Sequence, residues 1–323
     1  MILIDAAQVR QHLSFERCIS LVREAMVSLS NGESPRLQRS GIPVAKDAIF
    51  GVMPGVLGGV NKVFGAKLLG IFPEPERPSH QRHQGLVVVF DGHTGAPLCV
   101  ADAEEVTAIR TAAASALATE TLARDDACTL AVFGNGTQAR SHLRALTACR
   151  RYERILVWGR DVNKAREFAA EMCDELGLPI RAEPSAEAAA RNSDVICTLT
   201  GAFEPIVLGA WIQPGTHLNV VGSSMAGPAE IDGDLVARSR FYVDSRASAL
   251  TQAAEFLRAR DAGLVSDAHI LAELGEVLVN GSLGRAKKDD VTIYKSLGNI
   301  VQDLAVVRWL YTALQGQKSP PAS

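Results

Sequence analysis

Three basic residues in the first half of the chain have the chemistry to hold a small anion or to move a proton, namely Arg39, Lys67 and Arg110. Lys67 lies inside the apolar run 65–70, where loss of solvent lowers the pKa of an amine towards the range useful for proton transfer. There are two alternatives: Lys67 stays charged and pairs with a carboxylate, or it faces outward from a strand.

The two arginines are placed less clearly than Lys67. Arg110 precedes a run of small residues, 111–116, and an arginine on the solvent face of a helix is the ordinary interpretation there. Arg39 has a competitor in Arg36, and spacing alone does not choose between them. The chain has no His, Cys, Asp and Glu cluster with metal-ligand spacing, so we expect no metal site.

A second chemical signature is the glycine-rich stretch 129–139, which predicts a buried strand, a tight turn and a helix. Gly134, Gly136 and Ala139 form the pattern G-x-G-x-x-A. The first glycine permits the turn, the second lets the backbone approach a pyrophosphate, and the alanine lets the helix pack closely on the strand. The helix N-terminus then offers N–H groups to the phosphates. An ordinary strand–turn–helix corner is the alternative.

The same loop and the end of the next predicted strand, 154–158, give the expected cofactor contacts. An arginine after that strand pairs a 2′-phosphate bidentately, so Arg160 favours NADP(H), unless it is only a surface residue. An acidic residue there binds the ribose 2′-hydroxyl, so Asp161 keeps NAD(H) possible. We expect cofactor contacts from these two stretches at Gly134, Asn135, Gly136, Thr137, Gln138, Gly159 and Arg160.

Strands and helices alternate after this point, which predicts an α/β fold with a doubly wound, parallel, Rossmann-type sheet. Ligands bind at the carboxyl ends of such strands, so Thr200 and Gly222 are further candidates for the cofactor. The first part of the chain reads as strands and turns of a second, α+β domain. We assign 125–299 to the dinucleotide-binding domain, and 1–124 with 300–323 to a substrate-binding and dimerisation domain.

Composition limits the classes of partner and compartment. The chain has 323 residues, a net charge of −3 and 47% hydrophobic residues, which gives no reason to expect nucleic acid or an anionic membrane as a partner. Six scattered cysteines read as reduced thiols, and the N-terminus carries no signal-peptide pattern. No apolar run approaches the length of a membrane helix. We therefore expect a cytoplasmic protein.

Ten short segments carry a family pattern, namely 39–44, 53–55, 65–68, 83–84, 107–113, 134–139, 221–224, 242–245, 272–276 and 294–298. Together they make the chain resemble the ornithine cyclodeaminase/mu-crystallin family over nearly its whole length. The resemblance implies that Arg39, rather than Arg36, joins Lys67 and Arg110 in holding a substrate carboxylate, with Lys67 also near the path of the proton. It implies that Ser296 and Gly298 border the nicotinamide, and that the sheet-rich domain forms a homodimer.

Ser224 is the one departure that bears on the reaction. In cyclodeaminases of this family an aspartate stands there and acts as a base towards the distal amine, which a serine cannot do unaided. The resemblance therefore favours a reductase of a small, cyclic 2-imino acid such as pyrroline-2-carboxylate, with Ser224 near the substrate. The alternatives are an ornithine cyclodeaminase with catalytic NAD, an amino-acid dehydrogenase, and a crystallin-like protein that binds NADPH without turnover.

Overall fold

The structure, a computed structural model, describes residues 1–318 apart from 47, 61 and 73–82. The chain divides into two units, Met1–Arg110 with Asn299–Ser323 (unit 1), and Thr111–Gly298 (unit 2). The division falls inside helix α3 (Ala103–Leu122), whereas the sequence pattern placed it after residue 124. The roles assigned to the two units stay predictions, and each unit is described by itself.

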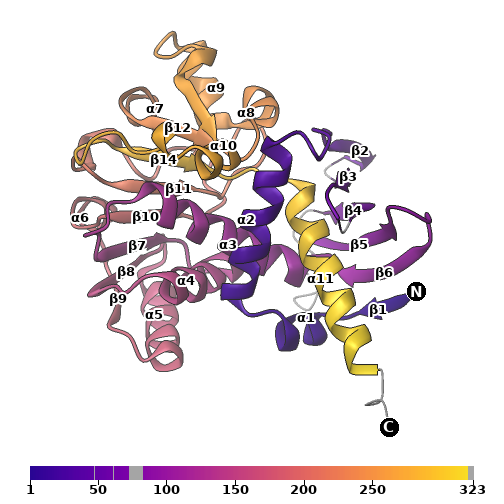
Figure 1. The fold of residues 1–323 in the computed structure, drawn as a ribbon. Coiled ribbons are helices and arrows are strands. Elements are labelled where there is room, and N and C mark those ends of the chain that lie inside the picture. Colours follow the sequence, from indigo (N-terminus) through magenta and orange to yellow (C-terminus); the bar gives the residue numbers. More distant parts are fainter. Residues whose placement is uncertain (47, 61, 73–82, 319–323) are drawn as a thin grey trace. The chain divides into compact units, whose positions relative to one another are not determined.

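Unit 1 is built on a mixed six-stranded sheet in the order β1-β6-β5-β4-β3-β2 (Figure 1). Every pair of neighbours is antiparallel except β1 and β6, which run parallel. Short turns connect most of the strands, and Asp91 closes the turn before β6 by accepting hydrogen bonds from the His93 and Thr94 amides. The strands are β1 (Ile2–Ile4), β2 (Ser40–Ala45), β3 (Ala48–Leu57), β4 (Val63–Ile71), β5 (His83–Asp91) and β6 (Pro97–Asp102).

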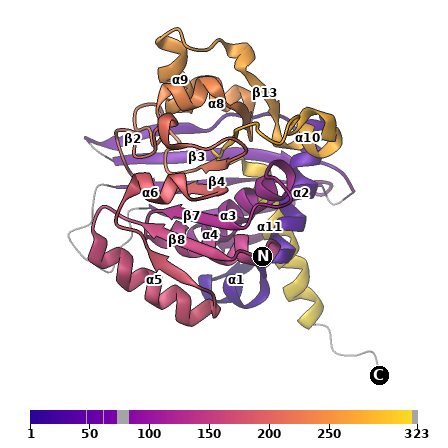
Figure 2. The same cartoon turned by 90° about the vertical axis from the view of Figure 1, so that its left-hand side faces the viewer.

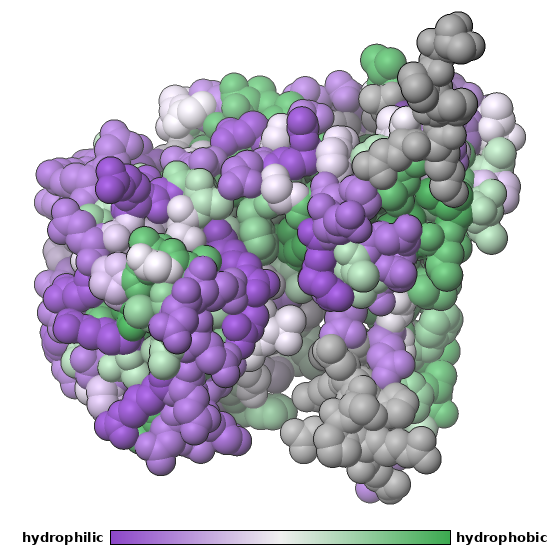
Figure 3. All heavy atoms as spheres, turned by 90° about the horizontal axis from the view of Figure 1, so that it is seen from below, coloured by the Kyte–Doolittle hydropathy of each residue, from purple (hydrophilic) through white to green (hydrophobic). Residues whose placement is uncertain are grey.

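One face of this sheet is covered by helices and the other is apolar and open. The helices of unit 1 are α1 (Ala6–His12), α2 (Phe15–Ser30), the first part of α3, and α11 (Ile300–Lys318). Helix α11 packs on β3, β4, β5 and β6 and on α2. The opposite face carries large side chains that are partly exposed, and hydrophobic residues line the right-hand side of Figure 3, where Figure 1 places these strands. They include Leu3, Ile42, Phe50, Phe64 and Leu86.

Unit 2 is built on an eight-stranded sheet in which every pair of neighbours is parallel. The stretch β9-β8-β7-β10-β11-β14 follows the order 3-2-1-4-5-6 of dinucleotide-binding sheets, with β12 and β13 beyond it. The predicted α/β fold with a doubly wound sheet is confirmed. The strands are β7 (Thr129–Phe133), β8 (Arg154–Trp158), β9 (Ile180–Ala182), β10 (Val195–Thr198), β11 (His217–Val220), β12 (Arg240–Val243), β13 (Ile270–Glu273) and β14 (Thr292–Lys295).

Helices cover both faces of the parallel sheet, because the chain reverses direction between β9 and β10 and right-handed crossovers then place α6 opposite α4 and α5. Helices α4 and α5 pack together, and α5 lies along β8 and β9 (Figure 2). The core between these layers is aliphatic, with Phe133 and Phe241 fully buried. The helices after α3 are α4 (Thr137–Cys149), α5 (Val162–Leu176), α6 (Ala186–Arg191), α7 (Gly233–Arg238), α8 (Arg246–Gln252), α9 (Ala254–Asp261) and α10 (Leu274–Val279).

The last helix begins later than the sequence pattern suggested, at Ile300 rather than near residue 296. Asp244 explains the difference, because its Oδ2 accepts hydrogen bonds from the Leu297 and Gly298 amides and holds this segment outside the helix. Gly298 adopts a φ of 82°, a left-handed conformation that also ends regular structure. In the part of the chain that the structure describes, no helix combines the length and the apolar character needed to cross a membrane.

Candidate active site

Lys67 lies on β4, an inner strand of unit 1, and its side chain is 2% exposed. In the sheet register it stands beside Met53 on β3 and Val87 on β5. Its Nζ donates a hydrogen bond to Asp303 Oδ1 on α11 at 3.0 Å and a second one to Thr107 Oγ1. The Lys67 side chain therefore does not face outward from the strand. Of the alternatives considered for it, pairing with a carboxylate is the one that the structure shows.

Arg110 reaches the same carboxylate from the end of the unit 1 part of α3. Its Nε lies 3.3 Å from Asp303 Oδ1, and its Nη1 donates to Gln302 Oε1 at 3.0 Å. Arg110 is buried, so the ordinary interpretation of it as an arginine on the solvent face of a helix is wrong. The other oxygen of Asp303, Oδ2, is buried and has no hydrogen-bond partner among the described residues. The carboxylate thus retains an acceptor inside the cluster.

Charge in this cluster is not balanced, because one carboxylate faces two cations. Burial lowers the pKa of Lys67 from 10.5 to about 8, although Asp303 opposes the change, and Arg110 and Arg39 lower it further. Burial favours a higher pKa for Asp303, but Arg110 and Lys67 outweigh it and hold that pKa below its ordinary value. A buried excess of positive charge is costly unless an anion joins it. The cluster is therefore suited to receive a carboxylate.

Arg39 and Arg36 lie in the segment before β2, and the structure separates them by exposure. Arg36 is exposed and Arg39 is half-buried. Arg39 is also close enough to Lys67 to contribute to the lowering of its pKa. This agrees with the choice of Arg39 as the third member of the basic group, whose role stays a prediction.

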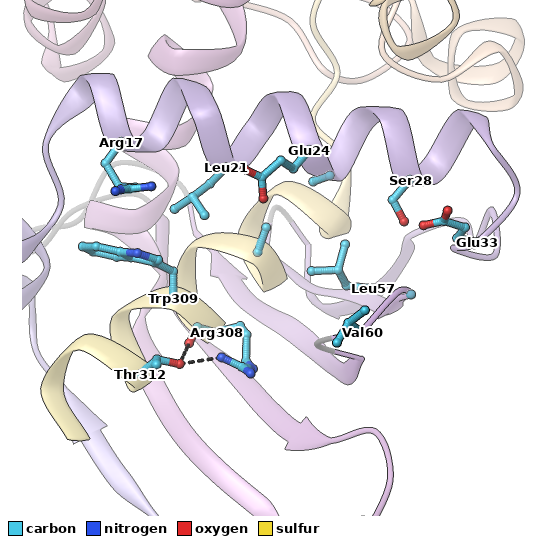
Figure 4. A pocket seen from close by; sticks show the side chains of 13 residues that line it. Arg17, Leu21, Glu24, Ser28, Glu33, Leu57, Val60, Arg308, Trp309 and Thr312 are labelled. Carbon is cyan, nitrogen blue, oxygen red and sulfur yellow. Dashed lines mark hydrogen bonds between the residues drawn. The ribbon is translucent and has the colours of Figure 1, made fainter. Parts of the chain in front are cut away.

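A separate groove in unit 1 lies between α2 and α11 and has a volume of about 470 Å³ (Figure 4). Arg17 stacks on the Trp309 ring at 5.6 Å from its centroid, and Arg308 donates a hydrogen bond to Thr312. None of the predicted site residues lines this groove. It occupies the side of α11 that carries Arg308 and Trp309, whereas Asp303 lies on the side that faces β4. We do not assign the active site to it.

In unit 2 the glycine-rich loop follows β7 and leads into α4. Gly134 has a φ of 127°, and a Cβ there would lie 2.9 Å from the Leu199 carbonyl oxygen, so glycine is required by the turn. A Cβ at Gly136 would meet nothing within 4 Å. Gly136 is the N-cap of α4 without a side-chain hydrogen bond, and Ala139 is fully buried. Open space beside unsatisfied helix amides fits a dinucleotide pyrophosphate.

Two side-chain oxygen atoms of the candidate set also lack hydrogen-bond partners within the described residues. Gln138 Oε1, on the first turn of α4, and Ser296 Oγ, after β14, are buried without a hydrogen bond. Buried polar atoms of native proteins are almost always paired, so orphaned ones at predicted contact positions fit a bound ligand. Thr137 is exposed at the start of the same helix, and Asn135 packs over Gly159 at the end of β8.

The end of β8 carries Arg160 and Asp161. Arg160 is exposed. Asp161 is the N-cap of α5, and its Oδ1 accepts hydrogen bonds from the Asn163 and Lys164 amides at 3.0 and 3.2 Å. Its carboxylate therefore already caps α5, which makes Asp161 a weaker candidate for the ligand of the ribose 2′-hydroxyl.

The remaining candidates lie in the segments that follow the other strands. Thr200 and Gly222 follow β10 and β11, and one buried carboxylate, Glu230, binds both. Ser224 is exposed in the same loop as Gly222. Among the described residues, no group of three or more His, Cys, Asp or Glu side chains is arranged to hold a metal ion.

Sequence reasoning missed the acidic partners of the site, Asp303, Glu230 and Asp244. Asp303 had a signal, since it is an acidic residue within the apolar stripe of the last predicted helix. Glu230 and Asp244 had no comparable signal, because each lies next to a loop whose path the pattern does not fix.

The comparisons with known proteins agree over the whole chain. The model of the ornithine cyclodeaminase/mu-crystallin family matches residues 1–318. The chain belongs to the ornithine cyclodeaminase/mu-crystallin family. It is 33% identical over 320 residues to the ketimine reductase mu-crystallin of Mus musculus, covering 98% of each chain. It is 30% identical over 313 residues to a Delta(1)-pyrroline-2-carboxylate reductase of Bacillus cereus, covering 96% of each.

Two solved structures of family type match equally broadly. The Delta(1)-pyrroline-2-carboxylate reductase of Thermococcus litoralis, in complex with NADH and L-proline, superposes with a TM-score of 0.92 at 31% identity over 100% of both chains. An archaeal alanine dehydrogenase dimer with bound NAD gives a TM-score of 0.91 at 26% identity, covering 98% of this chain and 97% of that chain. Membership of the family, as the ten segments implied, is confirmed.

Proposed function

We propose that the protein is an NAD(P)H-dependent reductase of a small, cyclic 2-imino acid such as pyrroline-2-carboxylate. The observation that carries the proposal is the buried cluster of Lys67, Arg110 and Asp303, in which two cations share one carboxylate and leave an excess of positive charge. A substrate carboxylate restores the charge balance. The dinucleotide fold of unit 2 and the named activities of two relatives, ketimine and pyrroline-2-carboxylate reduction, support the same conclusion.

In this proposal Arg39, Lys67 and Arg110 bind the substrate carboxylate, and Ser224 lies near the rest of the substrate. The reduced nicotinamide supplies a hydride to the carbon of the C=N bond. Lys67 donates the proton that the nitrogen takes up as the π electron pair moves onto it, so the product carries one new C–H and one new N–H bond. A pKa of about 8 leaves Lys67 mostly protonated at neutral pH, as a proton donor requires.

For the cofactor we propose a preference for NADP(H), with Arg160 as the ligand of the 2′-phosphate. The capping role of Asp161 supports this choice, because its carboxylate already binds two amides of α5. The solved relatives with NADH and NAD make NAD(H) the alternative. An Arg160→Gln variant is expected to lose about tenfold in kcat/KM with NADPH and little with NADH, since one charged contact is worth about 1.5–3 kcal/mol. Equal losses with both cofactors would contradict the assignment.

The alternative reactions differ in substrate and in net chemistry. An ornithine cyclodeaminase releases ammonia from ornithine with catalytic NAD, and the serine at position 224 disfavours it because a neutral hydroxyl is a poor base. An amino-acid dehydrogenase consumes a full equivalent of NAD(P) with an open-chain amino acid. A crystallin-like binding protein holds NADPH without turnover, and the buried basic cluster disfavours it because binding the dinucleotide does not need that cluster.

The test is oxidation of NADPH or NADH by the purified protein, followed by absorbance, with pyrroline-2-carboxylate and piperideine-2-carboxylate. Parallel reactions contain ornithine with NAD, and alanine with NAD or NADP. We expect rapid oxidation with a cyclic imine and none of the other reactions at a comparable rate. Formation of proline and ammonia from ornithine would replace the proposal with cyclodeamination. Saturable NADPH binding without any turnover would replace it with the binding protein.

We further propose that the protein is a cytoplasmic homodimer. The six cysteines, all among the described residues, are free thiols, which is in keeping with a reducing compartment. The open apolar face of the unit 1 sheet supports dimerisation, because such a face is usually covered by a partner. The alanine dehydrogenase relative is described as a dimer.

A further inference from the structure

Glu230 is a fully buried acidic residue whose side chain binds two separate loops of unit 2. Its Oε1 accepts hydrogen bonds from the Thr200 amide at 2.7 Å and the Thr200 hydroxyl at 2.8 Å. Its Oε2 accepts from the Thr198 hydroxyl at 2.7 Å and the Gly222 amide at 2.8 Å. Four donors on one carboxylate leave it no capacity for a further strong role, and they fix the loops after β10 and β11 to one another.

The two loops that Glu230 binds lie at the ligand-binding edge of the parallel sheet. After β9 the chain returns and places β10 on the free side of β7, so the strand order switches direction between the neighbours β7 and β10. Ligands bind at such a switch point, beyond the carboxyl ends of the strands. The segment after β10 lies directly beside the glycine-rich loop, because the Leu199 amide donates to the Phe133 carbonyl and Leu199 O lies 2.9 Å from the Cβ position of Gly134. Thr200 therefore borders the predicted cofactor crevice.

The backbone of Glu230 is held as firmly as its side chain. Its carbonyl accepts hydrogen bonds from the Ile206 and Val207 amides, and its amide donates to Glu255 Oε1 at 3.2 Å. Glu255 in turn lies 2.8 Å from Lys295 Nζ, and both of these side chains are fully buried. Burial raises the pKa of Glu230, while Lys295 and the Thr198 and Thr200 donors oppose the increase. The geometry needs an acceptor on both oxygens, which the ionised form supplies.

Gly222 shows how closely the carboxylate approaches the second loop. A Cβ at this position would lie 2.1 Å from the Thr200 carbonyl oxygen and 2.5 Å from Glu230 Oε1. A glycine is thus required for the contact. Gly222 begins the loop that carries Ser224, and Glu230 follows the end of the same loop, so the carboxylate also closes this loop at its base.

We propose that Glu230 is a positioning residue, which holds the Thr200 segment and the 222–230 loop in the conformation that accepts the dinucleotide. The inference deepens the proposed function and rests on it for the identity of the ligand. Glu230 itself touches neither cofactor nor substrate, because its four acceptor contacts are all internal. Glu230 increases the fraction of the protein whose two loops already have the binding conformation. That fraction sets the apparent affinity for the dinucleotide.

The test is the Glu230→Gln variant of the full-length protein, measured with NADPH by titration and without ligand by amide hydrogen exchange. An amide offers one acceptor and one donor atom, so either the Thr200 or the Gly222 amide must face an N–H group. We expect faster exchange in peptides covering 199–203 and 221–230 together. We also expect a rise of about tenfold in the NADPH dissociation constant, as follows when about a tenth of the protein has the loops in place.

Asp194→Asn is the matched control, because Asp194 also binds two main-chain amides, those of Cys128 and Thr129, near the opposite ends of the strands. It is expected to lower thermal stability without changing NADPH affinity or exchange in the two peptides. Thr198→Val and Thr198→Ser serve if Glu230→Gln does not fold. The valine removes the donor to Oε2 and weakens binding severalfold, whereas the serine retains it.

Folded Glu230→Gln with unchanged exchange in both peptides, or with wild-type NADPH affinity, overturns the inference. So does an equal loss of affinity in Thr198→Val and Thr198→Ser, since the effect must follow the hydroxyl. Absence of NADPH and NADH binding by the wild-type protein is a different result. It contradicts the proposed function, while the exchange measurement still decides whether Glu230 holds the two loops.

Discussion

Lys67 and Arg110 share one carboxylate, that of Asp303, in the buried cluster of unit 1. Each cation is also held by a neutral acceptor, Thr107 for the lysine and Gln302 for the arginine. The side chains are therefore fixed in the absence of a ligand, and the carboxylate proposed to bind there would meet them without reorganisation. Preorganised charge of this kind is the usual source of strong electrostatic binding.

The pH dependence of the reaction follows from Lys67. With a pKa of about 8, the amine is charged below this pH and neutral above it, so attraction for the substrate carboxylate decreases as the pH rises. We expect kcat/KM to decrease on the alkaline side with an apparent pKa of about 8, approaching tenfold per pH unit. In Lys67→Arg, binding of L-proline with the oxidised cofactor should persist to higher pH. A wild-type profile that is flat across this range contradicts the role of Lys67.

Asp303→Asn tests the charge balance of the cluster. The variant keeps the shape of the side chain but leaves Lys67 and Arg110 without a counter-ion. We expect the free energy of unfolding in urea to decrease by about 3 kcal/mol, the usual cost of breaking a buried ion pair. Because Asp303 raises the pKa of Lys67, the alkaline decrease in kcat/KM should also move to lower pH.

Glu171→Gln is the control for Asp303→Asn. It makes the same chemical change in an exposed ion pair with Arg140, where the carboxylate side chain is 61% exposed. Its effect on unfolding should stay below about 1 kcal/mol. Comparable stability losses in the two variants would show that Asp303 is not the buried counter-ion that the structure describes.

At the scale of elements, the two glycines in the turn between β7 and α4 differ in whether the fold itself needs a glycine at their position. Gly134 is needed by the fold, since its φ is 127° and a Cβ would press on the Leu199 carbonyl. Gly136 borders open space, so the chain itself does not need glycine there. The difference is the basis for the prediction that Gly136 serves the cofactor.

The variants Gly134→Ala and Gly136→Ala test this division. Gly134→Ala should lower the free energy of unfolding by about 2 kcal/mol because its backbone is strained for any other residue. Gly136→Ala should change stability by less than about 1 kcal/mol at this N-cap position. It should nevertheless raise the NADPH dissociation constant about tenfold, a cost of about 1.4 kcal/mol. Unchanged affinity in Gly136→Ala contradicts the phosphate contact.

Sequence patterns predicted the elements well where periodicity was strong. Strands β7 and β8 and helix α5 lie where the alternation of apolar residues and turns placed them. Strands β13 and β14 were missed, because each has four residues and follows helices too short to show a clear period. The start of α11 was misplaced because Asp244 acts on it from a distant part of the sequence.

The site residues also fall into those that local sequence could identify and those that it could not. The basic residues and glycines could be found because their types are informative in local context. Of their acidic partners, Asp303 alone had a signal, its place in the apolar stripe of the last helix. Its pairing with Lys67 could not be predicted, because that contact joins residues far apart in the chain. The choice of Arg39 over Arg36, and Ser224 as a substrate neighbour, came from family resemblance alone.

At the scale of the whole molecule, the open face of the unit 1 sheet exposes several large apolar side chains, which suits it to association with a partner. Phe64 and Phe90 stack on it with their ring centroids 5.2 Å apart, and Phe64 remains 37% exposed. The register places Leu86, Val88 and Leu3 in adjacent rows of the same face. A continuous apolar sheet surface of this kind favours association with a second copy.

Phe64→Glu tests the dimer. A charge in the centre of an apolar interface must be desolvated without a partner, so we expect the variant to be monomeric at concentrations where the wild type is dimeric. Light scattering after size-exclusion chromatography measures the mass directly. Val279→Glu, at a 57% exposed apolar residue at the end of α10, should remain dimeric. A monomeric wild type, or a dimeric Phe64→Glu, contradicts this interface.

The central claim is that the protein transfers hydride from a reduced nicotinamide to the carbon of a cyclic C=N bond. The most direct measurement is a single reaction of pyrroline-2-carboxylate with NADPH that carries deuterium at both C4 positions, followed by mass spectrometry of the proline formed. We predict one deuterium in proline, on the α-carbon, and the same label pattern with deuterated NADH at a lower rate. Proline without deuterium, or no proline in the presence of bound cofactor, would contradict the account.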